Sequence, residues 1–160
     1  MKIGIVGTGK VAYRHFEEFS KIDGVKIEAV CDVNSENLNL FTKKFGNHLR
    51  KYFSVDEMLK EEKNFDGICN NTPDRFHKEV SLKILEKGIN IFSEKPLAEN
   101  YEDAKILTDL AHKQKVINMV NFTYRESSGY QKLVETIKSD TLGSIKHVNA
   151  NYYQSWLTSN

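Results

Sequence analysis

The residues best suited to hold a phosphate group are Gly7–Ala12, which have the form G-x-G-x-x-G/A. They follow the short apolar run Ile3–Val6 and precede a helical pattern, which is the context that such a motif requires. Gly7 permits a tight turn, Gly9 lets the backbone approach a pyrophosphate, and Ala12 is small enough for helix–strand packing. The helix start adds unpaired N–H groups and a positive dipole end. We therefore expect a pyrophosphate site, the alternative being a glycine turn without a ligand.

A carboxylate stands at the distance from this loop at which a ribose would lie. Asp32 follows Ala12 by 20 residues and ends the apolar run Val25–Cys31. An acidic residue there accepts hydrogen bonds from the adenine-ribose hydroxyls of NAD and repels a 2′-phosphate. The next residues, 33–35, contain no arginine for such a phosphate, so NAD is favoured over NADP. Asp32 could also help to begin a helix over residues 35–45, and the two roles are compatible.

A further group of polar residues, Asn70–Asp74, follows the apolar run Asp66–Asn70. Thr72 as the N-cap and Pro73 as the first helical residue make a good helix start on capping grounds alone. His77 lies one turn further along. A lone histidine on a helix is more often structural than catalytic, so these residues by themselves predict only a helix.

The most reactive candidate is Lys95, within the sequence Glu94-Lys95-Pro96 that follows the apolar run Ile89–Ser93. In an open α/β sheet the carboxyl ends of the strands border the ligand crevice. If buried there, Lys95 could hydrogen-bond to a substrate oxygen or exchange a proton with it. The alternative is an exposed lysine beside a turn proline.

The elements that position these residues follow from short apolar runs that alternate with stripes of 3.6-residue period. Runs that are apolar on both faces are typical of strands in a parallel sheet covered by helices. The alternation predicts an α/β fold with a doubly wound parallel sheet, a Rossmann fold. The expected strands are Ile3–Val6, Val25–Cys31, Lys51–Ser54, Asp66–Asn70, Ile89–Ser93 and Val116–Val120.

The pattern changes after residue 121. Tyr130, Leu133, Val134 and Ile137 predict one more helix. Residues 144–153 are expected to form a half-polar strand, which is typical of a sheet covered on one side only. We therefore expect a Rossmann domain over residues 1–121 and the truncated start of a second α+β domain over residues 122–160. No clear element is expected for residues 154–160.

Composition excludes several functional classes. The chain has 160 residues and a net charge of +1, which gives no global electrostatic case for nucleic acid or an anionic membrane. No apolar run approaches the length of a bilayer span. The two cysteines, Cys31 and Cys69, are too few for a disulfide framework and suggest a reducing cytoplasm. No pair of histidines has metal-ligand spacing, so no metal is expected.

In order and spacing these motifs resemble the glucose–fructose oxidoreductase/inositol dehydrogenase (Gfo/Idh/MocA) family, and the Glu-Lys-Pro motif is the most specific of them. The resemblance implies hydride transfer between NAD(P) and a hydroxyl or carbonyl carbon of a sugar, polyol or sugar derivative. It places Lys95 at the substrate hydroxyl and Glu94 at the nicotinamide ribose, and it implies a cis bond before Pro96. The implied cofactor-binding residues are Gly7, Thr8, Gly9, Lys10, Val11, Asp32, Asn71, Thr72, Pro73, His77, Glu94 and Lys95.

The chain departs from the family pattern on the substrate side. Thr123 and Glu126 replace the more usual asparagine and aromatic residue, and Ser128-Gly129 stand where a proline often occurs. Family enzymes also have a second domain with a large sheet, which supplies an Asp/His pair, most sugar contacts and the oligomer interface. The 160 residues alone are therefore expected to bind the cofactor without being active. A homo-oligomer is the protein partner that the resemblance allows.

Two other functions remain open from the residues. A non-catalytic dinucleotide-sensing or partner-binding module would share the fold, with the strand expected at residues 144–153 pairing with another chain. An S-adenosylmethionine methyltransferase would share the glycine loop and Asp32. The methyltransferase gives no account of Glu94–Pro96 or Thr72-Pro73 and ranks below the other two.

Overall fold

The computed structural model describes residues 1–153 and divides the chain into two compact units, Met1–Phe122 and Thr123–Asn160. The first unit contains a six-stranded sheet with the order β3-β2-β1-β4-β5-β6, and every neighbouring pair is parallel. The strands are β1 (Lys2–Val6), β2 (Lys26–Cys31), β3 (Arg50–Tyr52), β4 (Gly67–Asn70), β5 (Asn90–Ser93) and β6 (Asn118–Val120). The order reverses between β1 and β4, where a ligand crevice opens in sheets of this topology. The predicted doubly wound parallel sheet is confirmed.

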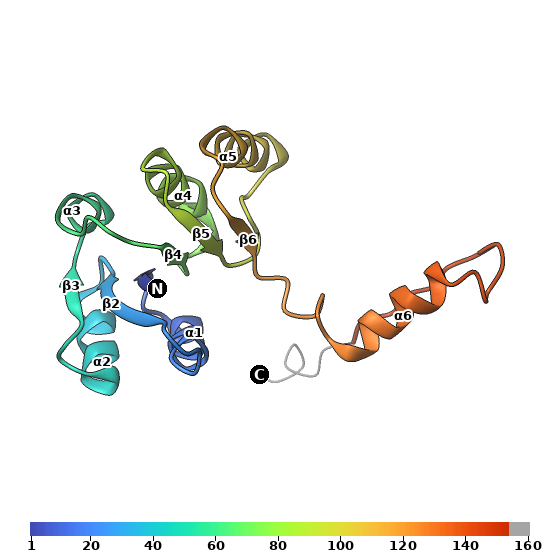
Figure 1. Ribbon diagram of the computed structural model, residues 1–160, viewed down its shortest axis with the longest axis horizontal. Helices are drawn as coiled ribbons and strands as arrows, with labels where there is room; N and C mark the ends of the chain where they lie inside the picture. Colours follow the sequence, from blue (N-terminus) through green and yellow to red (C-terminus); the bar gives the residue numbers. More distant parts are fainter. Residues whose placement is uncertain (154–160) are drawn as a thin grey trace. The chain divides into compact units, whose positions relative to one another are not determined.

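Helices cover both faces of this sheet, with α1 and α2 on one face and α3, α4 and α5 on the other (Figure 1). They are α1 (Lys10–Phe19), α2 (Ser35–Phe45), α3 (Val55–Glu61), α4 (His77–Glu86) and α5 (Tyr101–Gln114). Side chains that alternate along the inner strands pack into two separate cores, one on each face of the sheet. On β1, Ile5 packs in the core beneath α1 and α2, whereas Val6 packs in the core beneath α3, α4 and α5. Phe41 of α2 is fully buried and meets Phe16 of α1 edge to face.

The helix start predicted at Thr72 and Pro73 is wrong. The Thr72 backbone N–H and hydroxyl both donate to Asn70 Oδ1, at 3.2 and 2.7 Å. The hydroxyl therefore bonds to the last residue of β4 and does not cap a helix. Pro73 is extended, with φ −59° and ψ 150°, and a short 3₁₀ helix, η1 (Asp74–Phe76), follows it. Helix α4 then begins at His77. Asn70 therefore replaces the expected helix cap as the residue that shapes this loop.

The second unit contains the predicted helix, α6 (Ser128–Lys138). The strand expected at residues 144–153 is wrong, because the structure has no strand there. A strand is held by hydrogen bonds to a neighbour, and no strand pairs with this segment within residues 1–153. The expectation for residues 154–160 lies outside the described residues. Across residues 1–153 there is no helix whose length and apolar character would let it cross a membrane.

Candidate functional site

The glycine loop after β1 lies directly against the loop after β4. Gly7 has φ +84°, and a Cβ at this position would lie 2.6 Å from the carbonyl oxygen of Asn71 and 2.8 Å from the Thr72 nitrogen. The Gly7 N–H donates to the Cys31 carbonyl at 2.8 Å, which ties the loop to the end of β2 as well. Only glycine meets both the backbone angle and the close approach. The glycine loop therefore lies between the ends of β1 and β4, where the strand order reverses.

Gly9 has a different environment. Its φ is −68°, it precedes α1 as the N-cap, and a Cβ built on it would meet nothing within 4 Å. The first turn of α1 carries no acidic residue. Open space over the backbone beside unpaired helix N–H groups fits an anion such as a pyrophosphate. On the same turn, Lys10 and Val11 are exposed.

Asp32 links the glycine loop to the next helix. Its Oδ2 accepts hydrogen bonds from the Thr8 N–H at 2.7 Å and the Thr8 hydroxyl at 2.8 Å. Its Oδ1 accepts one from the Asn34 N–H at 2.8 Å, and the Asn34 side chain caps α2. Thr8 is thereby buried behind the loop. Because Oδ1 has a single donor within residues 1–153, it retains acceptor capacity for a ribose hydroxyl.

A groove of about 600 Å³ runs along this edge of the sheet. Of the predicted cofactor-binding residues, Gly7, Gly9, Asp32, Asn71, Thr72 and Pro73 line it together. The buried Asn71 has an amide nitrogen, Nδ2, without a hydrogen-bond partner among the described residues. An orphaned donor beside the groove fits a ligand that carries acceptor oxygens or nitrogens.

Among the groove residues that the sequence motifs do not predict is Arg75. Its guanidinium lies 4.8 Å from the Phe76 ring centroid, and both side chains line the groove together with Asp32. The sequence motif predicts a phosphate-binding arginine only directly after Asp32, whereas Arg75 comes from the 3₁₀ helix after β4. Only the order of the strands brings the two segments together.

His77 is fully buried and joins two loops of the site. Its Nε2 lies 2.7 Å from the Thr72 carbonyl oxygen, and its Nδ1 contacts the Pro96 carbonyl oxygen. Neither ring nitrogen is left for a ligand, so the arrangement suits a residue that holds the loops. The Lys95–Pro96 peptide bond is cis, as the family resemblance implied.

Glu94 and Lys95 follow β5 at the same edge of the sheet but do not line the groove. Glu94 is buried, and its Oε1 lies 2.7 Å from both His15 Nε2 and Asn121 Nδ2. Burial alone would raise the pKa of the Glu94 carboxyl, but the hydrogen bonds from Asn121 and His15 outweigh it and lower that pKa. Lys95 is exposed, so the burial expected for its side chain is not found.

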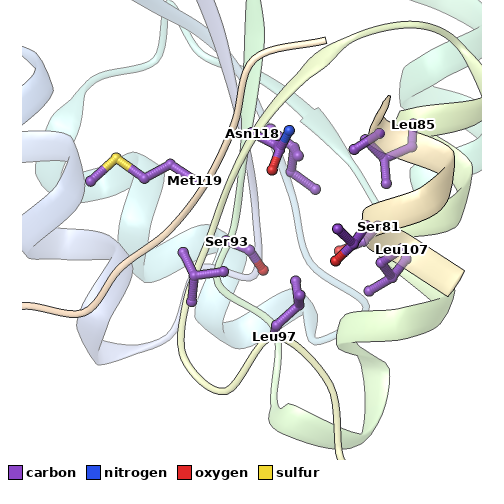
Figure 2. A pocket seen from close by; sticks show the side chains of 11 residues that line it. Ser81, Leu85, Ser93, Leu97, Leu107, Asn118 and Met119 are labelled. Atoms are coloured by element: carbon purple, nitrogen blue, oxygen red, sulfur yellow. The ribbon is translucent and has the colours of Figure 1, made fainter. Parts of the chain in front are cut away.

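A small cavity lies between β5, β6 and the helices α4 and α5 (Figure 2). Ser81 and Ser93 line it beside Leu85, Leu97 and Leu107. Its volume of about 30 Å³ has room for one water molecule. It is too small for a cofactor or a sugar. The groove beside Asp32 remains the candidate site because the predicted cofactor-binding residues line it. Within residues 1–153 no group of three or more His, Cys, Asp or Glu side chains could hold a metal ion.

Comparison with known proteins relates this site to a family of enzymes. A family model described as "Oxidoreductase family, NAD-binding Rossmann fold" (GFO_IDH_MocA) matches residues 1–122. Glucose-6-phosphate 3-dehydrogenase of Bacillus subtilis is 32% identical over 151 residues, which cover 94% of this chain and 42% of that enzyme. Myo-inositol 2-dehydrogenase of Thermotoga maritima is 27% identical over 143 residues, which cover 89% of this chain and 42% of that enzyme.

Solved structures agree with this relationship. The WlbA dehydrogenase of Chromobacterium violaceum, in complex with NADH and UDP-GlcNAcA, matches 89% of this chain and 41% of its own. The TM-score is 0.83 and the identity 26%. The chain spans 42% of the length of the curated relatives quoted above. It belongs to the Gfo/Idh/MocA oxidoreductase family, and residues 1–122 are its NAD-binding Rossmann domain.

Proposed function

We propose that this chain is the cofactor-binding part of an NAD-dependent oxidoreductase that acts on a hydroxyl or carbonyl carbon of a sugar, polyol or sugar derivative. The observation that carries the proposal is the shared edge of the sheet. There the open backbone at Gly9, the Asp32 carboxylate and the Glu94-Lys95 pair follow β1, β2 and β5. Sugar and polyol dehydrogenases among the relatives support the substrate class.

The residues divide the work along this edge. The backbone at Gly9 and the first turn of α1 hold the pyrophosphate, and Asp32 accepts hydrogen bonds from the adenine ribose. Lys95 hydrogen-bonds to the substrate oxygen and receives or returns its proton. The bound dinucleotide supplies the hydride acceptor or donor. Asp32 also disfavours a 2′-phosphate, so NAD is preferred over NADP.

Binding of NADH tests the proposal directly. We expect NADH fluorescence to change on titration with the 160-residue chain, and its melting temperature to rise with cofactor because the ligand binds only the folded state. Gly9→Ala places a methyl group where the pyrophosphate would lie and should abolish both effects. Loss of a favourable N-cap residue should cost about 1 kcal/mol or less in free energy of unfolding.

Gly129→Ala is the matched control, because Gly129 also has open space around its Cβ position and no positive φ, but lies in α6. It should bind NADH like the unmodified chain. If saturating NADH changes neither fluorescence nor melting temperature of the unmodified chain, the proposed function is wrong.

A further inference from the structure

Two side chains that none of the sequence motifs includes hold the buried carboxylate of Glu94. We propose that His15 and Asn121 are positioning residues, which fix this carboxylate so that its Oε2 accepts a hydrogen bond from a hydroxyl of the nicotinamide half of the dinucleotide. The proposal rests on the proposed function, since it names residues that act within the same site.

The backbone fixes where Glu94 and Asn121 lie. The Glu94 N–H donates to the Asn70 carbonyl at the end of β4, at 2.9 Å. The Asn121 N–H donates to the Ser93 carbonyl at the end of β5, at 2.8 Å. Both residues thus continue the ladder of parallel strands by one step, at the edge of the sheet where ligands bind. Their side chains meet because of the strand register, not because of local sequence.

His15 reaches the same carboxylate from α1. It is 9% exposed, its ring stacks on Phe19 at 6.0 Å, and the Phe92 ring meets it edge to face at 5.3 Å. Packing of this kind fixes the plane of the imidazole. Because Gly9 is the N-cap of α1, one helix connects the expected pyrophosphate site to the Glu94 carboxylate.

The two oxygens of the Glu94 carboxylate differ in their hydrogen bonds. Oε1 receives hydrogens from both His15 Nε2 and Asn121 Nδ2, at 2.7 Å each. Among the described residues, Oε2 has only a long contact of 3.3 Å, with the Lys95 N–H. The Glu94 side chain remains 11% exposed, so water or a ligand reaches part of it. An ionised carboxylate only accepts hydrogens, and therefore Oε2 suits a hydroxyl donor.

The two donors to Oε1 also prevent the carboxylate from turning. Rotation that moved Oε2 away from the ligand would break both short hydrogen bonds at once. The same constraint acts on the next residue, because the Lys95 N–H contacts Oε2. His15 and Asn121 therefore act on the cofactor through Glu94 and do not themselves touch it.

The test compares NADH with ADP, which lacks the nicotinamide and its ribose. His15→Phe keeps an aromatic ring between Phe19 and Phe92 but removes the Nε2 donor. Asn121→Ser shortens the second donor at the edge of the sheet. Hydrogen bonds to charged groups are strong enough that we expect each variant to raise the Kd for NADH about tenfold. The Kd for ADP should stay within about twofold of the unmodified value.

Glu94→Gln provides a second measurement. Its amide oxygen can still accept from His15 and Asn121, but an NH₂ group then replaces Oε2 and presents a donor instead of an acceptor. It should weaken NADH binding as much as the other variants and leave ADP binding unchanged. His15→Gln, which restores an N–H donor, should recover part of the NADH affinity.

Each outcome decides the matter. If the unmodified chain binds NADH but the variants weaken NADH and ADP equally, or weaken neither, the positioning roles are wrong and the proposed function stands. If the unmodified chain binds neither ligand, both proposals fail. Should His15→Phe not fold, as judged by thermal unfolding, Asn121→Ser decides, because Asn121 is only half-buried.

Discussion

At the scale of single residues, Asp32 shows how one side chain serves the fold and the site together. Both of its oxygens hold backbone N–H groups, one in the glycine loop and one at the start of α2. The carboxylate is therefore fixed before any ligand arrives. Preorganisation of this kind lowers the entropic cost of binding. The same charge would repel a phosphate on the ribose.

Asp32→Ser should change the choice of cofactor. Loss of the acceptor should weaken NADH binding about tenfold, the equivalent of one hydrogen bond to a charged group. Loss of the negative charge should strengthen NADPH binding relative to NADH, because Arg75 lines the same groove and can meet the 2′-phosphate. Titration with both nucleotides by fluorescence gives the ratio of the two Kd values.

Adding Arg75→Gln to Asp32→Ser tests the role given to the arginine. The double variant should lose the relative gain for NADPH while binding NADH like the single variant. A Kd ratio that stays the same in Asp32→Ser as in the unmodified chain would contradict the assignment of Asp32 to the ribose.

The sequence predicts site residues where their role depends on spacing along the chain. The spacing of Gly7, Gly9 and Asp32 is local to one β-α-β unit, so the sequence predicts a site there. His15 and Glu94 are separated by 79 residues, and no spacing rule connects them. Arg75 was missed for the same reason. Their contacts depend on strand order and register, which appear only when the chain is folded.

At the scale of elements, the strands carry different chemistry at their two ends. The candidate site lies at the carboxyl ends, while an ion cluster lies at the amino ends of β1 and β3. There Glu62 accepts hydrogen bonds from Lys2 Nζ at 2.8 Å, Arg50 Nη2 at 2.9 Å and the Tyr52 hydroxyl at 2.9 Å. The Glu62 side chain is 6% exposed. This cluster joins the end of α3 to the sheet and serves stability.

The Glu62 cluster makes the free energy of unfolding depend on pH. Hydrogen bonds from Arg50 outweigh burial and lower the pKa of Glu62 from 4.5 to about 2. A lowered pKa in the folded state stabilises the protein above the unfolded pKa, and this contribution is lost as the pH falls from 4.5 through about 2. The shift corresponds to about 3 kcal/mol.

Glu62→Gln should therefore lose about 3 kcal/mol of unfolding free energy at neutral pH and almost none at the acid end of this range. Urea unfolding at a series of pH values measures both profiles. Glu17→Gln, which alters an exposed pair with Lys44, is the control and should follow the unmodified chain. Parallel pH profiles for Glu62→Gln and the unmodified chain would contradict this role of the cluster.

The periodicity of apolar residues predicted the strands and helices that bury side chains in the core. It did not predict structure that depends on a hydrogen-bond partner elsewhere in the chain. All six predicted strands of the first unit overlap observed strands. The inner strands β1, β2, β4 and β5 each place side chains in both cores, which is the pattern that periodicity detects. Residues 144–153 alternate too, yet form no strand, since alternation without a neighbouring strand leaves the backbone groups unpaired. The helix start at Thr72 failed because Asn70 engages the threonine hydroxyl.

At the scale of the molecule, every residue assigned to the cofactor lies in the first unit, Met1–Phe122. Lys95 is exposed there, and within residues 1–153 its amine makes no ion pair or hydrogen bond. Hydride transfer needs a substrate held against the nicotinamide and shielded from water. The relatives quoted above are longer, and this chain spans 42% of their length.

We therefore expect the 160-residue chain to bind NADH without measurable turnover of glucose 6-phosphate or myo-inositol, as measured by NADH absorbance. A dinucleotide-sensing module would also bind NADH without turnover.

A chimera distinguishes part of an enzyme from such a sensing module. Residues 1–122 joined to the remaining part of the Bacillus subtilis relative should oxidise that enzyme's substrate if Lys95 is catalytic. Lys95→Met in the chimera should lower kcat at least about 100-fold while NADH still binds, as expected for a lost general acid–base group. Robust turnover by the 160 residues alone would show that they hold a complete active site. A chimera that folds and binds NADH but never turns over would instead support the sensing module.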